Sequence, residues 1–249
     1  MPGYATRQFT VPVGGHDYLI RALSDRQQFA DPDGAAERIG ISPALWGLFG
    51  QVWPAGRLLA EAMSTHEVAG KRVLELGCGL GLSSLVLQRR KADITASDHH
   101  PLAELFLRRN AKQNQLPFVV YHDLPWAIPD TRLGRFDLII GSDILYERDH
   151  AQLLAAIMLR HASDHTEILI TDPGRGNSGR FSRAMAAQGF GVVEKRSRFD
   201  ASDMPPFSGR LLNYQRAFAP AALASSAVRA PCYTDNVSTD NVSTHALAP

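Results

Sequence analysis

Cysteine and long apolar runs are both scarce in this chain. Its 249 residues include two cysteines, Cys78 and Cys232, which lie far apart. A disulfide framework or a structural zinc site needs several closely spaced cysteines, so the sequence argues against both. No segment approaches the ~20 apolar residues of a membrane span, and the first residues hold no apolar run of signal-peptide length. We therefore expect a cytoplasmic protein that does not bind a membrane.

A strong charge of either sign is also absent. The 26 lysines and arginines nearly balance the 25 aspartates and glutamates, which leaves a net charge of +1. A chain balanced in this way has no global field that would hold it on nucleic acid. Histidines are paired at His99 and His100 and at His161 and His165, but no third ligand stands at metal-binding spacing. The sequence thus predicts neither a nucleic-acid partner nor a bound metal.

Short apolar runs alternate with amphipathic stretches along most of the chain. This pattern is typical of an α/β fold in which helices cover both faces of a mostly parallel sheet, a Rossmann-like architecture. We predict seven strands, at residues 72–76, 93–96, 118–121, 136–141, 167–171, 191–197 and 210–216. Helices are expected at residues 54–63, 81–89, 101–113, 149–161 and 178–188.

The two ends of the chain differ from this pattern. Residues 7–22 alternate around two glycines as in a small hairpin, and residues 24–37 are polar and loop-like. The tail is alanine-rich and then repeats Asp-Asn-Val-Ser-Thr, a composition typical of disorder. We therefore predict an N-terminal extension outside the core (1–44), a main domain (45–218) and a disordered tail (219–249).

A glycine-rich loop follows the first predicted core strand. It runs from Glu75 to Gly81, with further glycines at Gly77 and Gly79, and it opens a helix. Glycines let the backbone turn tightly and let a ligand approach, while free N–H groups at a helix start can bind a cofactor carboxylate. The dinucleotide-binding motif Gly-x-Gly-x-x-Gly would need its third glycine at position 82, which is Leu82 here. Taken alone, the loop fits a cofactor site and a tight turn equally well.

Three more residues suited to cofactor binding fall at predicted strand ends. Asp98 ends the second strand, where its carboxylate can accept both ribose hydroxyls of a nucleoside; capping a helix is its alternative role. Asp123 and Trp126 follow the third strand, where a carboxylate can bind the adenine amino group and an indole can cover the ring. Closing the core is the alternative role of Trp126. The carboxyl ends of parallel strands meet at one edge, so we expect a single site there.

These motifs together resemble those of a known family. The matching segments are Gly50–Ala55, Glu75–Gly81, Asp98, Asn110, Leu124–Trp126 and Ser142–Tyr146. They are similar to the family-16, seven-β-strand methyltransferases, which use S-adenosylmethionine and include many protein-lysine methyltransferases. The resemblance covers residues 45–217.

The resemblance implies a set of site residues. Those that would contact S-adenosylmethionine are Trp53, Gly77, Gly79, Asp98, Trp126 and Ser142. The loop residues Glu75, Cys78 and Gly81 and the strand-end Asp123 complete our predicted cofactor site. Asp143 and Tyr146 match the Asp-x-x-Tyr motif of the family's active site, so we predict that Asp143 orients the acceptor amine and Tyr146 supplies a hydroxyl and an aromatic face. A helix cap and a packing residue are their alternative roles.

Methylation of a protein lysine is the function that this motif set favours. A small-molecule N- or O-methyltransferase is an alternative, because one cofactor half serves many acceptors. A non-catalytic cofactor-binding module is another. We also predict that residues 8–41 pack beside the mouth of the active site and help to choose the acceptor.

Overall fold

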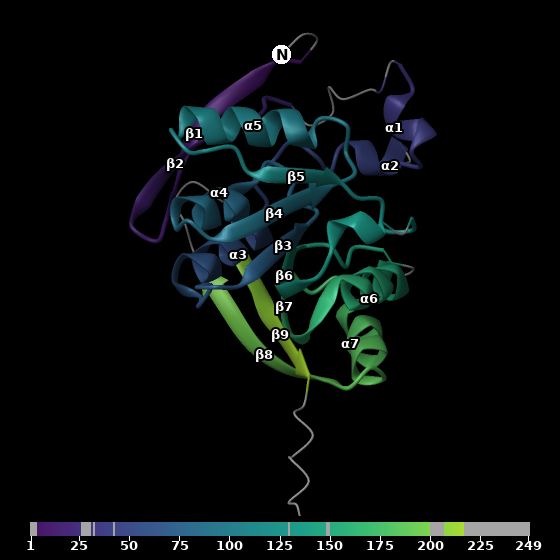
Figure 1. The fold of residues 1–249 in the computed structure, drawn as a ribbon. Helices are drawn as coiled ribbons and strands as arrows, with labels where there is room; N and C mark the ends of the chain where they lie inside the picture. Colours follow the sequence, from purple (N-terminus) through teal and green to yellow (C-terminus); the bar gives the residue numbers. More distant parts are fainter. Residues whose placement is uncertain are drawn as a thin grey trace, which may run out of the picture. The chain divides into compact units, whose positions relative to one another are not determined.

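The computed structural model describes residues 4–25, 31, 33–41, 43–128, 130–147, 150–199 and 207–216. Its main element is a seven-stranded sheet. The strands are β3 (Arg72–Leu76), β4 (Asp93–Asp98), β5 (Val120–Asp123), β6 (Phe136–Ser142), β7 (Ala162–Asp172), β8 (Phe190–Phe199) and β9 (Phe207–Arg216). They lie in the order β5-β4-β3-β6-β7-β9-β8, with β9 antiparallel to both neighbours and the other pairs parallel (Figure 1). The predicted mostly parallel α/β sheet is confirmed.

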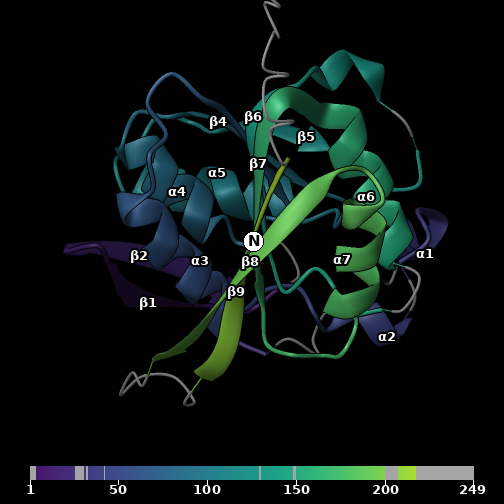
Figure 2. The ribbon, with the colours of Figure 1, turned by 90° about the horizontal axis from the view of Figure 1, so that it is seen from below.

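Helices cover both faces of this sheet. On one face lie α3 (Pro54–Thr65), α4 (Leu82–Arg89) and α5 (Ala103–Gln113), and on the other lie α6 (His150–His161) and α7 (Ser178–Ala186), as the view from below shows (Figure 2). No helix in the described part of the chain is long and apolar enough to cross a membrane.

The central strands supply side chains to both layers, because successive residues of a strand point to opposite faces. In β3, Val73 packs on the side of α3, α4 and α5, whereas Leu74 packs on the side of α6 and α7. Leu138 and Ile139 of β6 repeat this alternation. All four side chains are completely buried. Continuous apolar strands are typical of parallel sheets covered on both faces, and for this reason the sequence predicted them well.

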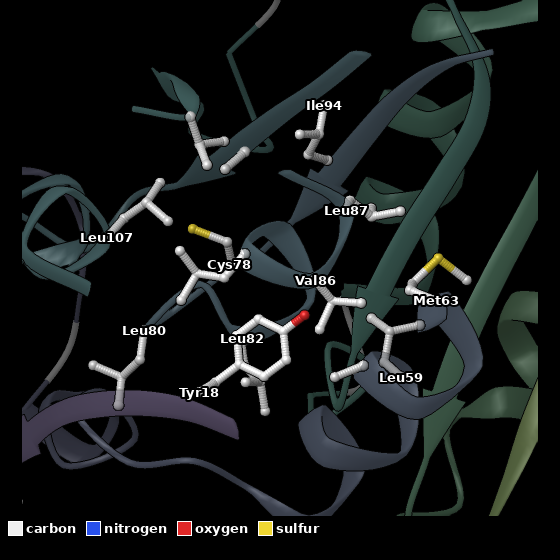
Figure 3. Close-up of a cluster of buried hydrophobic side chains, with 14 of the residues drawn as sticks. Tyr18, Leu59, Met63, Cys78, Leu80, Leu82, Val86, Leu87, Ile94 and Leu107 are labelled. Carbon is white, nitrogen blue, oxygen red and sulfur yellow. The ribbon is translucent and has the colours of Figure 1, made fainter. Parts of the chain in front are cut away.

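The N-terminal hairpin belongs to the core. Its strands, β1 (Thr6–Val13) and β2 (His16–Leu23), pair antiparallel and contact α3 and α5. Tyr18 and Ile20 are buried in the same cluster as Cys78, and Figure 3 shows Tyr18 among side chains of α3, α4 and the glycine loop. The prediction that this segment lies outside the core is therefore wrong. Alternation along β2 gives the hairpin an apolar face, and the helices cover that face.

Some boundaries also differ from the prediction. β5 begins two residues later than expected, because its register is set by pairing with β4, from Thr95 with Val120 to Asp98 with Asp123, rather than by its apolar run. Three short helices were not predicted: α1 (Ala35–Arg38), α2 (Pro43–Trp46) and the 3-10 helix η2 (Thr131–Leu133). The predicted disordered tail lies outside the described residues.

Candidate active site at the carboxyl ends of the strands

A cavity of about 680 Å³ opens at the carboxyl ends of β3, β4 and β6. Its volume falls in the usual range of ligand sites, roughly 300–1,000 Å³. The predicted site residues that line it are Trp53, Glu75, Gly77, Cys78, Gly79, Gly81, Asp98, Trp126, Ser142, Asp143 and Tyr146. The sheet thus brings together segments that are far apart in the sequence.

The glycine loop turns where β3 meets α4. Gly79 and Gly81 both have left-handed backbone conformations, with φ of 55° and 83°. A Cβ at Gly81 would stand 2.2 Å from Cδ1 of Leu107, so a larger residue there would displace that side chain as well as strain the backbone. A Cβ at Gly79 would meet nothing within 4 Å. Gly79 therefore presents bare backbone to open space, which allows a ligand to approach closely.

Asp98 ties this loop to the neighbouring strand. Its carboxylate accepts backbone N–H groups from Gly79 at 2.8 Å, from His99 at 2.7 Å and from His100 at 2.9 Å. A carboxylate offers about four acceptor positions, so these bonds leave about one for a ligand hydroxyl. Burial raises the pKa of Asp98, although the three N–H groups oppose that shift. Asp98 thus shapes the loop and also lines the cavity.

Glu75 and Cys78 are both buried in the loop. Burial raises the pKa of Glu75 to about 7, and the hydroxyl of Ser84 donates to its Oε2 atom. Burial also raises the pKa of the Cys78 thiol well above its ordinary value, so the sulfur is no nucleophile. The Cys78 N–H donates to the carbonyl of Ser97 at 2.9 Å, a second link between the loop and β4.

An aromatic cluster forms another wall of the cavity. The ring of His150 contacts Trp126 with centroids 5.0 Å apart and Tyr146 with centroids 4.6 Å apart, both edge to face. Nε2 of His150 lies 3.3 Å from Oε2 of Glu147. Burial raises the pKa of Tyr146, which therefore keeps its hydroxyl proton. His150 and Glu147 were not predicted from the sequence, although both lie just after the Asp-x-x-Tyr motif.

Asp143 stands at the entrance to the β6–α6 loop in a left-handed conformation, with φ of 51°. Its N–H donates to the carbonyl of Thr171 at 2.8 Å, which fixes the loop to β7. Its carboxylate receives two hydrogen bonds from Arg175, at 2.6 and 2.7 Å. Arg175 also lines the cavity and was not predicted. A signal for it was present: an arginine between two glycines at the carboxyl end of a core strand.

Asp123 is the one predicted residue, among those described, that does not line the cavity. Its exposed carboxylate lies 2.8 Å from Nδ1 of His99, at the edge of the sheet. The second ring nitrogen of His99 lies 2.9 Å from the carbonyl of Ile39. The structure thus places Asp123 against His99 and outside the lining of the cavity.

The N-terminal segment contributes to the site only in part. Ile39, Gly40 and Ile41 line the cavity, whereas the hairpin packs away from it on α5. Asn110 of α5 connects these regions, because its side chain accepts the Arg21 N–H and donates to the carbonyl of Leu80 in the glycine loop. No group of three or more His, Cys, Asp or Glu in the described ranges is arranged to hold a metal ion.

Comparison with solved structures agrees with the fold described above. The 16S rRNA methyltransferase RsmC of T. thermophilus, solved in complex with AdoMet and guanosine, superposes with a TM-score of 0.57. The two chains are 18% identical, over 85% of this chain and 51% of that one. At this identity the likeness concerns the fold alone.

Comparison of sequences identifies the family. The chain is 35% identical over 139 residues to the electron transfer flavoprotein beta subunit lysine methyltransferase of Mus musculus, covering 54% of this chain and 52% of that protein. It is 31% identical over 184 residues to a calmodulin-lysine N-methyltransferase of Arabidopsis thaliana, covering 68% and 59%. The chain thus spans little more than half the length of these relatives. Residues 44–185 match the lysine methyltransferase family, and the chain belongs to that family.

Proposed function

We propose that this chain transfers a methyl group from S-adenosylmethionine to a lysine side chain of a protein. The observation that carries the proposal is the position of Asp143, whose carboxylate lines the same cavity as the glycine loop and Asp98. One cavity therefore offers groups for the cofactor and a group for a cationic acceptor. The resemblance of the sequence motifs to a family predicted S-adenosylmethionine as the methyl donor. The match to the family model supports this donor.

The residues on the cofactor side fit this donor. The open backbone at Gly79 admits a ligand, and the start of α4 presents N–H groups suited to the carboxylate of its methionine part. Asp98 would accept a ribose hydroxyl, and Glu75 would face the amino group. Trp126 would cover the adenine ring. Bound there, S-adenosylmethionine supplies a methyl group attached to an electron-poor sulfur.

The residues on the acceptor side would orient the amine and remove water from around it. A lysine side chain has an ordinary pKa of ~10.4, so it arrives protonated and must release a proton to solvent at the open mouth of the cavity before it attacks. Asp143 would hold this amine in line with the methyl group by hydrogen bonding. Tyr146 and Trp126 offer aromatic faces to a cationic side chain, an interaction of ~0.5–2 kcal/mol. These contacts place the two reactants together and exclude water, which is most of what an in-line transfer requires.

A protein acceptor is favoured over a small molecule. The mouse and Arabidopsis relatives are named for protein substrates, and the cavity is open to solvent beside exposed apolar residues, Ile128 and Leu153. Such a rim suits a protein surface better than a buried small molecule. The cytoplasmic location and the exclusion of nucleic-acid acceptors stay predictions.

The test is methyl transfer from labelled S-adenosylmethionine into a soluble cell extract. Macromolecular and small-molecule label are separated, and the native chain is compared with Asp143→Asn. We expect label in a discrete protein band, at a lysine, that is lost in the variant. Asp17→Asn is the matched control, because Asp17 is exposed on the hairpin.

Each outcome selects one function. Label confined to the small-molecule fraction would favour the small-molecule alternative. Binding of S-adenosylhomocysteine by calorimetry, with no transfer to any fraction, would favour a non-catalytic module. If neither ligand binding nor transfer occurs, the whole assignment of the cavity is wrong.

A further inference from the structure

The carboxylate of Asp143 already holds a cation. Arg175, in the loop after β7, donates from Nε to Oδ1 of Asp143 at 2.6 Å and from Nη2 to Oδ2 at 2.7 Å. Two parallel bonds of this kind are the strongest geometry for a guanidinium and a carboxylate. The side chain of Asp143 is 12% exposed and that of Arg175 is 41% exposed. The guanidinium is therefore the outer partner of the pair.

The loop that carries Arg175 is anchored on both sides of it. Asp172 accepts a backbone N–H of the loop at 3.1 Å, and Asn177 donates to a backbone carbonyl of the β6–α6 loop at 2.9 Å. Between these anchors Arg175 is flanked by Gly174 and Gly176, with φ of 93° and 88°. Glycine adopts many backbone conformations at little cost. The arginine can therefore leave the carboxylate while both anchoring contacts persist.

We propose that Arg175 is a resident cation that occupies the acceptor position on Asp143 and is displaced by the ammonium group of the incoming side chain. This inference rests on the proposed function and narrows it to acceptors that bring a positive charge. Exchange of one cation for another leaves the carboxylate paired throughout. A neutral acceptor would have to separate the ion pair without replacing it, and a largely buried charge left alone is costly. Arg175 is thus a specificity-determining residue.

The exchange can be observed without any methyl transfer. The Nε–H signals of isotope-labelled arginine side chains are recorded by NMR for the full chain, and the Arg175 signal is assigned with Arg175→Lys. We expect Asp143→Asn to move this signal. Titration with n-butylammonium, which carries the charged end of a lysine side chain, should move it toward the same position. The neutral control n-butanol should leave it in place.

The activity test separates competition from a structural role. The extract protein that accepts the label is supplied at increasing concentration to the native chain, to Arg175→Gln and to Arg175→Lys. The rate of methyl transfer is measured at each concentration. Since the glutamine variant has no resident cation, we expect its half-saturating acceptor concentration to fall about two- to fivefold, the range of an exposed ion pair. The lysine variant keeps a cation and should stay close to the native value. A merely structural role would instead lower the maximal rate and leave half-saturation unchanged or raised.

The two proposals can fail separately. If Asp143→Asn moves the Arg175 signal but n-butylammonium does not, the pair exists without exchange, and the inference is overturned while the proposed function stands. If the signal moves as expected but the native chain methylates nothing, the proposed function fails and the exchange stands. A signal indifferent to Asp143→Asn would refute the ion pair itself.

Discussion

Glu75→Gln should stabilise the protein at alkaline pH. The pKa of Glu75 is about 7 in the folded chain against 4.5 when unfolded, because the carboxyl is buried. Above pH 4.5 the unfolded chain releases this proton more readily, so the carboxyl lowers the free energy of unfolding as the pH rises toward 7. A shift of this size corresponds to about 3 kcal/mol, which is reached at pH 7 and stays constant above it. Glutamine is neutral, has nearly the same shape and retains an acceptor for the Ser84 hydroxyl. The free energy of unfolding of the variant should therefore not decrease between pH 4.5 and 7 on account of this residue.

The assay is urea unfolding followed by tryptophan fluorescence, at pH 5 and at pH 8. We expect the variant to exceed the native chain by about 1–3 kcal/mol at pH 8 and by little at pH 5, the upper value being the full linkage term. Glu104→Gln, on an exposed face of α5, is the matched control and should change little at either pH. Under the proposed function the variant should also bind S-adenosylhomocysteine more weakly, because glutamine would offer the ligand's amino group no negative charge. Equal unfolding free energies at pH 8 would show that burial does not raise the pKa of Glu75, and the reasoning would fail.

Three further substitutions test other parts of the structure. Glu167→Gln should destabilise the protein at neutral pH by about 1–2 kcal/mol, because the hydrogen bond from His66 lowers the Glu167 pKa to about 2 from 4.5 and solvent screens part of that interaction. The stabilisation is complete above pH 4.5, so the difference in unfolding free energy should shrink as the pH falls toward 2. His99→Leu removes the contact with the Ile39 carbonyl, so hydrogen exchange of residues 33–41 should accelerate while that of α6 does not. Asn110→Leu leaves buried backbone groups without their amide partner and should lower the unfolding free energy by roughly 1–3 kcal/mol, and an unchanged denaturation midpoint would contradict this.

The parts of the fold that the sequence predicted are those decided locally. The core strands are apolar on both faces, so their positions can be predicted from the local sequence. The positions of Gly79, Asp98 and Asp143 then follow, because parallel strands end at one edge of the sheet. The positions of these residues can be predicted without information about their interaction partners elsewhere in the chain.

The parts that failed depend on partners far away in the chain. Arg175 binds Asp143 across 32 residues, and no pattern within either segment names the other. Asp123 is held by His99, 24 residues away, and so does not reach the cavity. The hairpin enters the core because helices from later in the chain cover its apolar face, and Asn110 of α5 adds a hydrogen bond to β2. In each case the deciding interaction is tertiary, and it overrides what the local sequence favours.

The two halves of the site are built from different kinds of interaction, and this difference has a functional consequence. On the cofactor side, buried or half-buried hydrogen bonds join the backbone at Cys78 and Gly79 to β4. Removing one of these would leave a buried polar group without a partner, at about 1–3 kcal/mol, so this half tolerates little variation. On the acceptor side, the contact between Asp143 and Arg175 joins two loops through a half-exposed guanidinium. An ion pair of that kind contributes little to stability, so the acceptor half can change among relatives without loss of the fold. Relatives that are similar in sequence yet bear the names of different protein substrates are what such a division predicts.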